Sequence, residues 1–204
     1  MRLYHDSRAP NPRRVRMFLA EKGLTSAVEL VEVSINARAH QTPEHLARHP
    51  LGLVPVLELD DGRHLTESVA ICRYIDELHP EPQLFGTDAW SRAKVEEWNR
   101  HAELELLIPV AQVFRNSHAF WQGRIRQAPD FADIMRELLA DRLTWLDREL
   151  ADRRFLAGDA FSIADITALC ALDFGKVSNI RLGDATPNVK RWHAEVAGRP
   201  SAKA

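Results

Sequence analysis

Cysteine and a surplus of either charge are what this sequence of 204 residues most clearly lacks. Its two cysteines, Cys72 and Cys170, are too few for a disulfide scaffold, and both lie inside apolar helical patterns. We therefore expect two small, buried, hydrophobic side chains. The 27 basic and 29 acidic residues almost cancel, with a formal net charge of -2. This balance indicates neither a nucleic acid nor a membrane surface as a partner.

Long apolar runs are absent as well. No stretch of about 18 apolar residues occurs, which argues against a transmembrane helix. The start, MRLYHDSRAP, lacks the apolar segment of a secretory signal. With 45% hydrophobic and 27% charged residues, the composition is that of an ordinary globular protein, which we expect in the cytoplasm.

The first 78 residues mix short strand patterns with helix patterns. Strand patterns occur at 2–5 and 27–33 and on both sides of the turn Asp60-Asp61-Gly62, which is typical of a hairpin. Helix patterns occur at 13–24, 43–48 and 67–79. The resulting order, β-α-β-α-β-β-α, predicts a four-stranded mixed sheet with helices packed on it.

The remainder of the chain has helical patterns only. Residues 79–88, HPEPQLFGTD, contain two prolines and a glycine and are typical of a linker. Helices are predicted from 91 to about 119, from 130 to 152, from 161 onward and at 187–198. We therefore predict an α/β domain at 1–79, a linker at 80–89 and an all-helical domain at 90–204.

Val54-Pro55 is the first pattern that indicates a binding site. Proline cannot donate to a strand ladder, so within a strand pattern it marks an edge or a start. If the bond were cis, the backbone N–H and C=O of Val54 would turn outward, where an extended peptide could pair with them. The alternative is a plain edge-strand proline.

Thr66-Glu67-Ser68 is the second pattern, at the start of a predicted helix. A helix N-terminus offers unpaired N–H groups and a positive dipole end, which suit a carboxylate. Ser68 would hold that carboxylate and Glu67 an ammonium, as an α-amino acid head group requires. The alternative is a simple N-cap. Beside an outward-facing Val54 backbone, the pattern fits a γ-glutamyl-cysteinyl peptide.

The chain resembles the cytosolic glutathione S-transferase superfamily. The resemblance rests on HPLGLVPVLELDDGRHLTESVAICRYIDELHP, on the opening LYHDSRAPNPRRVRMFLAEKGL, and on FLAGDAFSIADITALCALDF. It implies a thioredoxin-like N-terminal domain and an all-helical C-terminal domain that forms the cavity for the second substrate. It also implies glutathione as co-substrate, no metal, and a cytoplasmic homodimer with a role in detoxification.

The resemblance assigns a glutathione-binding role to a set of residues. The backbone of Val54, next to a cis Pro55, would hold the cysteinyl part, and Glu67 and Ser68 the γ-glutamyl end. His40 stands where theta-like members have a histidine near the glycine carboxylate, although it could be an exposed loop histidine. Leu53 occupies a position where some relatives carry a lysine for that carboxylate, so one ionic contact is expected to be missing.

Activation of the glutathione sulfur is the part that the pattern assigns least directly. A free thiol has a pKa near 8.5. The serine position of theta and zeta members falls on Ala9 here, and no beta-class cysteine is present. The string APNPRRV resembles the proteobacterial nu-class pattern, in which the asparagine, here Asn11, donates toward the sulfur. Ser7 is the alternative, although a turn serine after Asp6 is its simpler role.

Two further polar patterns have structural interpretations. Ser162 and Asp165 have the spacing of a capping box at a helix start. His45 and His49 are four residues apart but lack a flanking acid at metalloprotease spacing, so they predict no metal site.

We therefore expect a glutathione-dependent transferase that acts on an electrophilic or disulfide-containing small molecule. With a disulfide substrate, the expected activity is a glutathione-dependent disulfide reductase. A glutathione-binding or regulatory protein on the same fold, with little catalysis, is the alternative. Nucleic acid and membrane are not expected as partners.

Overall fold

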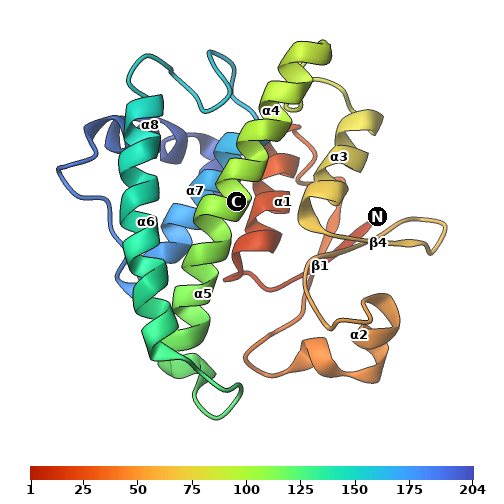
Figure 1. Cartoon of the computed structure of the whole chain (residues 1–204). Coiled ribbons are helices and arrows are strands. Elements are labelled where there is room, and N and C mark those ends of the chain that lie inside the picture. Colours follow the sequence, from red (N-terminus) through yellow and green to blue (C-terminus); the bar gives the residue numbers. More distant parts are fainter. The chain divides into compact units, whose positions relative to one another are not determined.

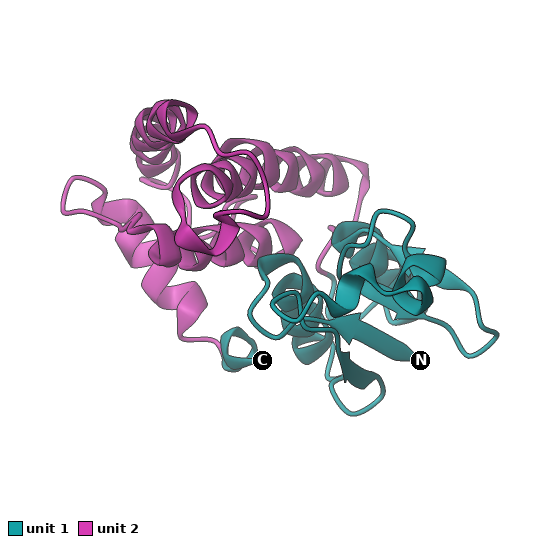
Figure 2. Cartoon of the chain, turned by 90° about the horizontal axis from the view of Figure 1, so that it is seen from below, with its two compact units in different colours: residues 1–83, 200–204 teal, residues 84–199 magenta.

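The computed structural model describes residues 1–204, which form two compact units. One unit consists of 1–83 together with 200–204, and the other of 84–199 (Figure 2). Sequence patterns predicted boundaries at 79 and 90 and assigned the C-terminus to the helical part. Compared with the predicted domain at 1–79, the first unit extends to residue 83 and also includes the last five residues.

The first unit is a four-stranded sheet with helices (Figure 1). Its elements, in chain order, are β1 (Arg2–His5), α1 (Pro10–Glu21), β2 (Glu29–Glu32), the 3-10 turn η1 (Ala39–Gln41), α2 (Pro43–Arg48), β3 (Val56–Glu58), β4 (His64–Thr66) and α3 (Ser68–Leu78). The strand order is β2-β1-β3-β4, with β1 and β2 parallel and the other pairs antiparallel. The mixed sheet and the predicted order of elements are confirmed.

The two faces of the sheet are distinguished by the alternation of side chains along each strand. Leu3 and Leu57 pair directly across β1 and β3, and both are completely buried. Tyr4 and Val56, one residue along, lie on the opposite face in a cluster that also contains Val54. Both faces of the sheet centre are therefore apolar, and charged residues stay at its margins.

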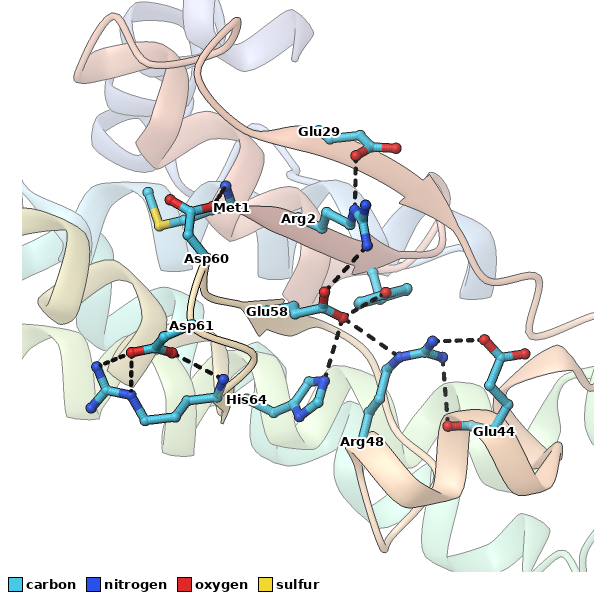
Figure 3. A network of polar contacts seen from close by, with 11 residues as sticks. Met1, Arg2, Glu29, Glu44, Arg48, Glu58, Asp60, Asp61 and His64 are labelled. Carbon is cyan, nitrogen blue, oxygen red and sulfur yellow. Dashed lines mark hydrogen bonds and ion pairs between the residues drawn. The ribbon is translucent and has the colours of Figure 1, made fainter.

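A polar network around Glu58 covers one such margin (Figure 3). The Tyr4 hydroxyl donates to its carboxylate at 2.8 Å, and the side chains of Arg2, His64 and Arg48 lie 3.3, 3.4 and 3.9 Å from it. The Tyr4 hydrogen bond is the main reason that the pKa of Glu58 lies below its usual value. Because Arg48 ends α2, this network attaches that helix to β3.

Lys22 explains why the first unit extends past residue 79. Its side chain is fully buried and pairs with Asp76 at 2.6 Å. The ammonium also donates to the backbone carbonyls of His79, Pro80 and Pro82, at 2.8, 3.1 and 2.5 Å. A buried ammonium needs such partners, so the segment that sequence patterns identified as a linker is anchored at its start.

The C-terminal turn η5 (Pro200–Lys203) belongs to the same unit because it binds α1. Arg13 donates to the carbonyl of Ala202 at 3.0 Å, and the Ser201 hydroxyl donates to the Glu21 carboxylate. These contacts, which no local pattern indicates, place the last residues with the sheet unit.

The second unit is entirely helical. Its elements are α4 (Ala89–His101), a π-helical segment η2 (Ala102–Leu107), α5 (Ile108–Ser117), η3 (Ala119–Trp121), α6 (Pro129–Glu149), α7 (Ile163–Gly175), η4 (Lys176–Ser178) and α8 (Pro187–Ala197). One long helix was predicted from 91 to about 119, and the chain is helical without a break over 89–117; the π-helical segment at 102–107 was not predicted. Pro109 cannot donate a backbone hydrogen bond and its ring crowds the preceding turn, and the helix bulges immediately before it.

No helix of the chain is both long enough and apolar enough to span a membrane.

α7 is the core helix of this unit, and a buried carboxylate ties its start to α8. The predicted capping box is present: Ser162 and Asp165 satisfy one another's backbone N–H groups. Asp165 also accepts from the Leu156 N–H at 2.9 Å and the Trp192 indole N–H at 2.8 Å. Complete burial raises the pKa of Asp165 to about 6, against the opposing effect of these hydrogen bonds.

Both cysteines are buried and form no disulfide, as expected: Cys72 is completely buried and Cys170 is 1% exposed.

The end of β1 holds a buried, neutral histidine. Arg16 approaches the Nδ1 atom of His5 at 3.0 Å, and since a guanidinium can only donate, Nδ1 accepts. Burial, and then the charge of Arg16, lower the pKa of His5 below its ordinary value of 6.5.

We expect the capping box to contribute unequally through its two members. Ser162→Ala removes one capping hydrogen bond and should lower the free energy of unfolding by about 1 kcal/mol. Asp165→Ala also strands the buried N–H groups of Leu156 and Trp192, so its cost should exceed about 3 kcal/mol. Urea titrations of both variants measure the difference, and equal costs would contradict the role of Asp165 as the shared acceptor.

We expect His5 to make the protein less stable in mild acid. Below pH 6.5 the unfolded chain takes up a proton on this histidine while the folded chain does not, so the free energy of unfolding falls as pH falls toward the lowered pKa. His5→Asn keeps an acceptor for Arg16 but cannot titrate. Urea titrations at about pH 7.5 and 5.5 should show a smaller loss for this variant than for the wild type; equal losses would refute the assignment.

Candidate functional site

Strand register brings the predicted site segments to one end of the sheet. Val56 pairs with Tyr4 on one side and with Thr66 on the other. Because β3 runs antiparallel to both neighbours, the exits of β1 and β4 lie beside the entry of β3. The turn after β1, the Val54 loop and the Glu67-Ser68 helix start therefore adjoin one another.

Val54 has its side chain in the core and its backbone unpaired. The Val54–Pro55 peptide bond is cis, as the family resemblance implied. The side chain is 8% exposed and packs with Tyr4 and Val56. Neither its N–H nor its C=O hydrogen-bonds to the rest of the chain. This is the arrangement that an extended peptide needs if it is to pair with Val54.

The start of α3 combines backbone donors with a buried cation. Ile71 is the first residue of this helix to donate back, to the carbonyl of Glu67 at 2.9 Å, so the N–H groups before it are unpaired. The Ser68 hydroxyl accepts from the guanidinium of Arg14 at 2.8 Å, and Arg14 is 1% exposed. Helix end and guanidinium together create a positive potential suited to a carboxylate.

Glu67 lies on the solvent side of this helix end. Its φ of 68° lies in the left-handed region that a residue with a side chain seldom adopts. Its carboxylate is exposed and makes no hydrogen bond or ion pair within the chain. The Glu67 carboxylate is a hydrogen-bond acceptor, and the free N–H groups of the helix beside it are donors. Together they suit a zwitterionic ligand.

Two loops touch where His40 and Leu53 lie. His40 is half-buried in η1, and Leu53 is 45% exposed. Between them stands Gly52 with φ +60°, where an added Cβ would lie 2.9 Å from the backbone oxygen of His40 and 2.5 Å from the Gln41 side chain. Only glycine allows this approach, so Gly52 sets how the His40 loop meets the Val54 loop.

The loop is also held by buried histidines. The Nε2 of His45 lies 2.8 Å from the carbonyl oxygen of Leu53, and the Nδ1 of His49 accepts from the Leu51 N–H at 3.3 Å. Burial, and then the neighbouring His45, lower the pKa of His49. These histidines act inside the loop, and no group of three or more His, Cys, Asp or Glu side chains could hold a metal ion.

The turn after β1 contains Ser7 and leads into Asn11, the two residues considered as hydrogen-bond donors to the glutathione sulfur. Ala9 packs against the cluster that contains Val54. Since α1 begins Pro10-Asn11-Pro12, Asn11 has the only N–H among its first three residues. Neither that N–H nor the exposed side-chain amide of Asn11 has a partner in the chain.

Ser7, by contrast, is engaged elsewhere. Its hydroxyl donates to Glu32 at 3.4 Å and its N–H to the same carboxylate at 3.2 Å. The turn is fixed by Asp6, which accepts from the N–H groups of Arg8 and Ile35 at 2.9 and 2.8 Å. Burial would raise the pKa of Asp6, but these hydrogen bonds outweigh it and lower that pKa.

No sequence pattern assigned a role in the site to Arg14, His45 or Gly52. Gly52 stands inside the G-x-V-P string and could have been singled out there. The local pattern around Arg14 is that of a surface arginine at a basic helix start. His45 was considered only together with His49, as a pair that predicts no metal site. Only the fold reveals that both are buried against the backbone or hydroxyl of a predicted site residue.

We expect Gly52→Ala to be more destabilising than Gly62→Ala. Both glycines have positive φ, so both variants incur a backbone penalty of about 1 kcal/mol. An added Cβ at Gly62 meets nothing within 4 Å, whereas at Gly52 it meets a backbone oxygen. The overpacking should add about 1–3 kcal/mol in urea titrations; equal losses would show that the two loops do not meet at Gly52.

Two family models match the chain. Residues 9–78 match the glutathione S-transferase N-terminal domain, and residues 130–200 match the glutathione S-transferase C-terminal domain. The first match includes the Val54 loop and the start of α3, and the second includes the capping box of α7.

Curated and solved proteins agree with these matches. Glutathione S-transferase 2 of Saccharomyces cerevisiae is 34% identical over 205 residues, covering 100% of this chain and 88% of that protein. The crystal structure of Gtt2 from Saccharomyces cerevisiae has a TM-score of 0.94 and 34% identity, covering 100% of this chain and 99% of that one. A glutathione S-transferase domain-containing protein of Marinobacter aquaeolei VT8 has a TM-score of 0.93 and 35% identity, covering 98% and 99%. The chain belongs to the glutathione S-transferase superfamily.

Proposed function

We propose that the protein binds glutathione and uses its thiolate to attack an electrophilic or disulfide-containing small molecule. The observation that carries this proposal is the unpaired Val54 backbone beside the free N-terminus of α3 at one end of the sheet. Membership of the glutathione S-transferase superfamily supports it.

In this proposal the peptide lies along the entry of β3. The cysteinyl part pairs with the N–H and C=O of Val54 as an added strand would. The γ-glutamyl carboxylate accepts hydrogen bonds from the N–H groups at the start of α3 and from the Ser68 hydroxyl. The Glu67 carboxylate accepts from the γ-glutamyl ammonium. The half-buried His40 is assigned to the glycine carboxylate, and Leu53 contributes backbone only.

The chemical step needs a thiolate. The glutathione thiol loses its proton to solvent, and the sulfur electron pair forms a bond to an electrophilic carbon while the leaving group departs with its own pair. With a disulfide, the thiolate attacks one sulfur and expels the other as a thiolate, which is protonated. A second glutathione then attacks the mixed disulfide, so two glutathiones are oxidised as the substrate is reduced.

Asn11 is assigned to stabilise that thiolate. Lowering a thiol pKa by two units is worth about 2.7 kcal/mol, within the range of a helix N-terminus and one or two donors. The unpaired N–H and amide of Asn11 provide such donors at the start of α1. Ser7 is the weaker candidate because its hydroxyl and N–H both donate to Glu32.

A glutathione-binding or regulatory protein with little catalysis is the second candidate. The observation in its favour is Ala9, an apolar residue packed against the Val54 cluster at the position of the theta and zeta serine. The hydroxyl of Tyr4 is already donated to Glu58, so it is not available to the sulfur. Homodimer formation, a cytoplasmic location and a detoxification role are carried over from the family as parts of the proposal.

We expect the protein to be retained on immobilised glutathione and to turn over an aryl halide or hydroxyethyl disulfide. Asn11→Ala should lower kcat about tenfold, equivalent to about 1.4 kcal/mol, with little change in KM for glutathione. The thiolate absorbance of bound glutathione should then appear only at higher pH than in the wild type.

Ser7→Ala is the matched control, since it removes a polar side chain from the same turn and should leave kcat within about twofold. If Ser7→Ala lowers kcat and Asn11→Ala does not, the sulfur ligand is Ser7. Retention without turnover of either substrate favours the binding protein, and the absence of retention refutes both functions.

A further inference from the structure

His45 is a buried histidine with one defined hydrogen bond. It lies in the short helix α2 and is 2% exposed. Its Nε2 is 2.8 Å from the carbonyl oxygen of Leu53, and because a carbonyl only accepts, Nε2 carries the proton and donates. The Nδ1 atom is buried without a hydrogen-bond partner, so the bond to Leu53 is the only hydrogen bond of the ring.

The carbonyl that His45 holds belongs to the same peptide unit as the N–H of Val54. The Leu53–Val54 bond is trans, since the cis bonds of the chain lie at Val54–Pro55 and Glu81–Pro82. In a planar trans peptide the C=O and N–H point in opposite directions. A donor fixed on the Leu53 oxygen therefore turns the Val54 N–H away from α2, where it meets no partner in the chain.

From this geometry we infer that His45 is a positioning residue for peptide capture at Val54, an inference that rests on the proposed glutathione function. His45 orients the Leu53–Val54 peptide plane so that the Val54 N–H faces the cysteinyl carbonyl. It also polarises that peptide, because a hydrogen bond accepted at C=O strengthens donation by the N–H of the same unit.

α2 is fixed well enough to act as this support. The Thr42 side chain caps the helix by accepting from the His45 N–H at 3.3 Å. At the other end, the guanidinium of Arg48 stacks 4.3 Å from the centre of the Tyr4 ring. It also lies 3.9 Å from the Glu58 carboxylate (Figure 3). The His45 ring is thus held relative to β3, the strand that Val54 precedes.

Other contacts hold the rest of the loop but leave this peptide plane to His45. Leu51 is held through its N–H by His49, and Gly52 through its carbonyl by Gln41, at 3.3 and 3.4 Å. The exposed Leu53 side chain offers no hydrogen bond of its own. Its contribution to the site is the carbonyl that His45 holds.

The test compares three variants of His45. His45→Gln keeps a donor near the position of Nε2, His45→Leu fills the site without a donor, and His45→Asn is polar but too short to reach Leu53. Glutathione affinity is measured by calorimetry, and the amide resonances of Val54 and Ser68 are followed by NMR during the glutathione titration. Fold is checked on the same spectra.

We expect His45→Leu and His45→Asn to weaken glutathione binding about tenfold, and His45→Gln by less than about threefold. In the two weak variants the Val54 amide should lose most of its glutathione-induced shift while the Ser68 amide keeps its own. A merely structural role would reduce both shifts together. If His45→Leu does not fold, His45→Asn and His45→Gln still give this comparison.

Two results would overturn the inference: wild-type affinity and an unchanged Val54 shift in His45→Asn, or equal weakening in His45→Gln and His45→Asn. Failure of the proposed function looks different, because neither Val54 nor Ser68 of the wild type would then respond to glutathione.

Discussion

The pairing register of very short strands is the constraint on which the rest of the first unit depends. Val56 faces Tyr4 on one side and Thr66 on the other, and this single row sets where three loops meet. A slip of one residue would exchange the two faces of the sheet and turn the Val54 side chain out of its apolar cluster. The unpaired Val54 backbone and the free start of α3 would then no longer adjoin.

Buried polar side chains hold the backbone around this site. His45 binds the carbonyl of Leu53, Asp6 binds the N–H groups that close the turn before Asn11, and Arg14 reaches the Ser68 hydroxyl. Each buried polar group needs a partner, so each contact is a strong local restraint. The groups left for a ligand are mostly main-chain donors and acceptors whose directions these side chains decide.

The helical unit relies on a different device. Near the start of its core helix α7, the carboxylate of Asp165 accepts hydrogen bonds from the backbone N–H groups of Ser162 and Leu156. It also accepts one from the indole N–H of Trp192. Local sequence predicted the cap because Ser162 and Asp165 stand three residues apart. The contribution of Trp192, 27 residues further on, has no local signal. Apolar periodicity likewise does not indicate the π-helical segment at 102–107, which lies just before Pro109.

Local sequence patterns were sufficient for the order of strands and helices, the capping box and the apolar helical surroundings of both cysteines, since each depends on neighbours in the chain. The cis Val54–Pro55 bond was expected only through the resemblance of its motif to the glutathione S-transferase superfamily. Tertiary structure alone decided that residues 200–204 join the sheet unit, that Arg14 lies under Ser68, and that His45 supports Leu53. Those facts depend on strand register and on burial between segments that are far apart in sequence, and neither periodicity nor local propensity records such distances.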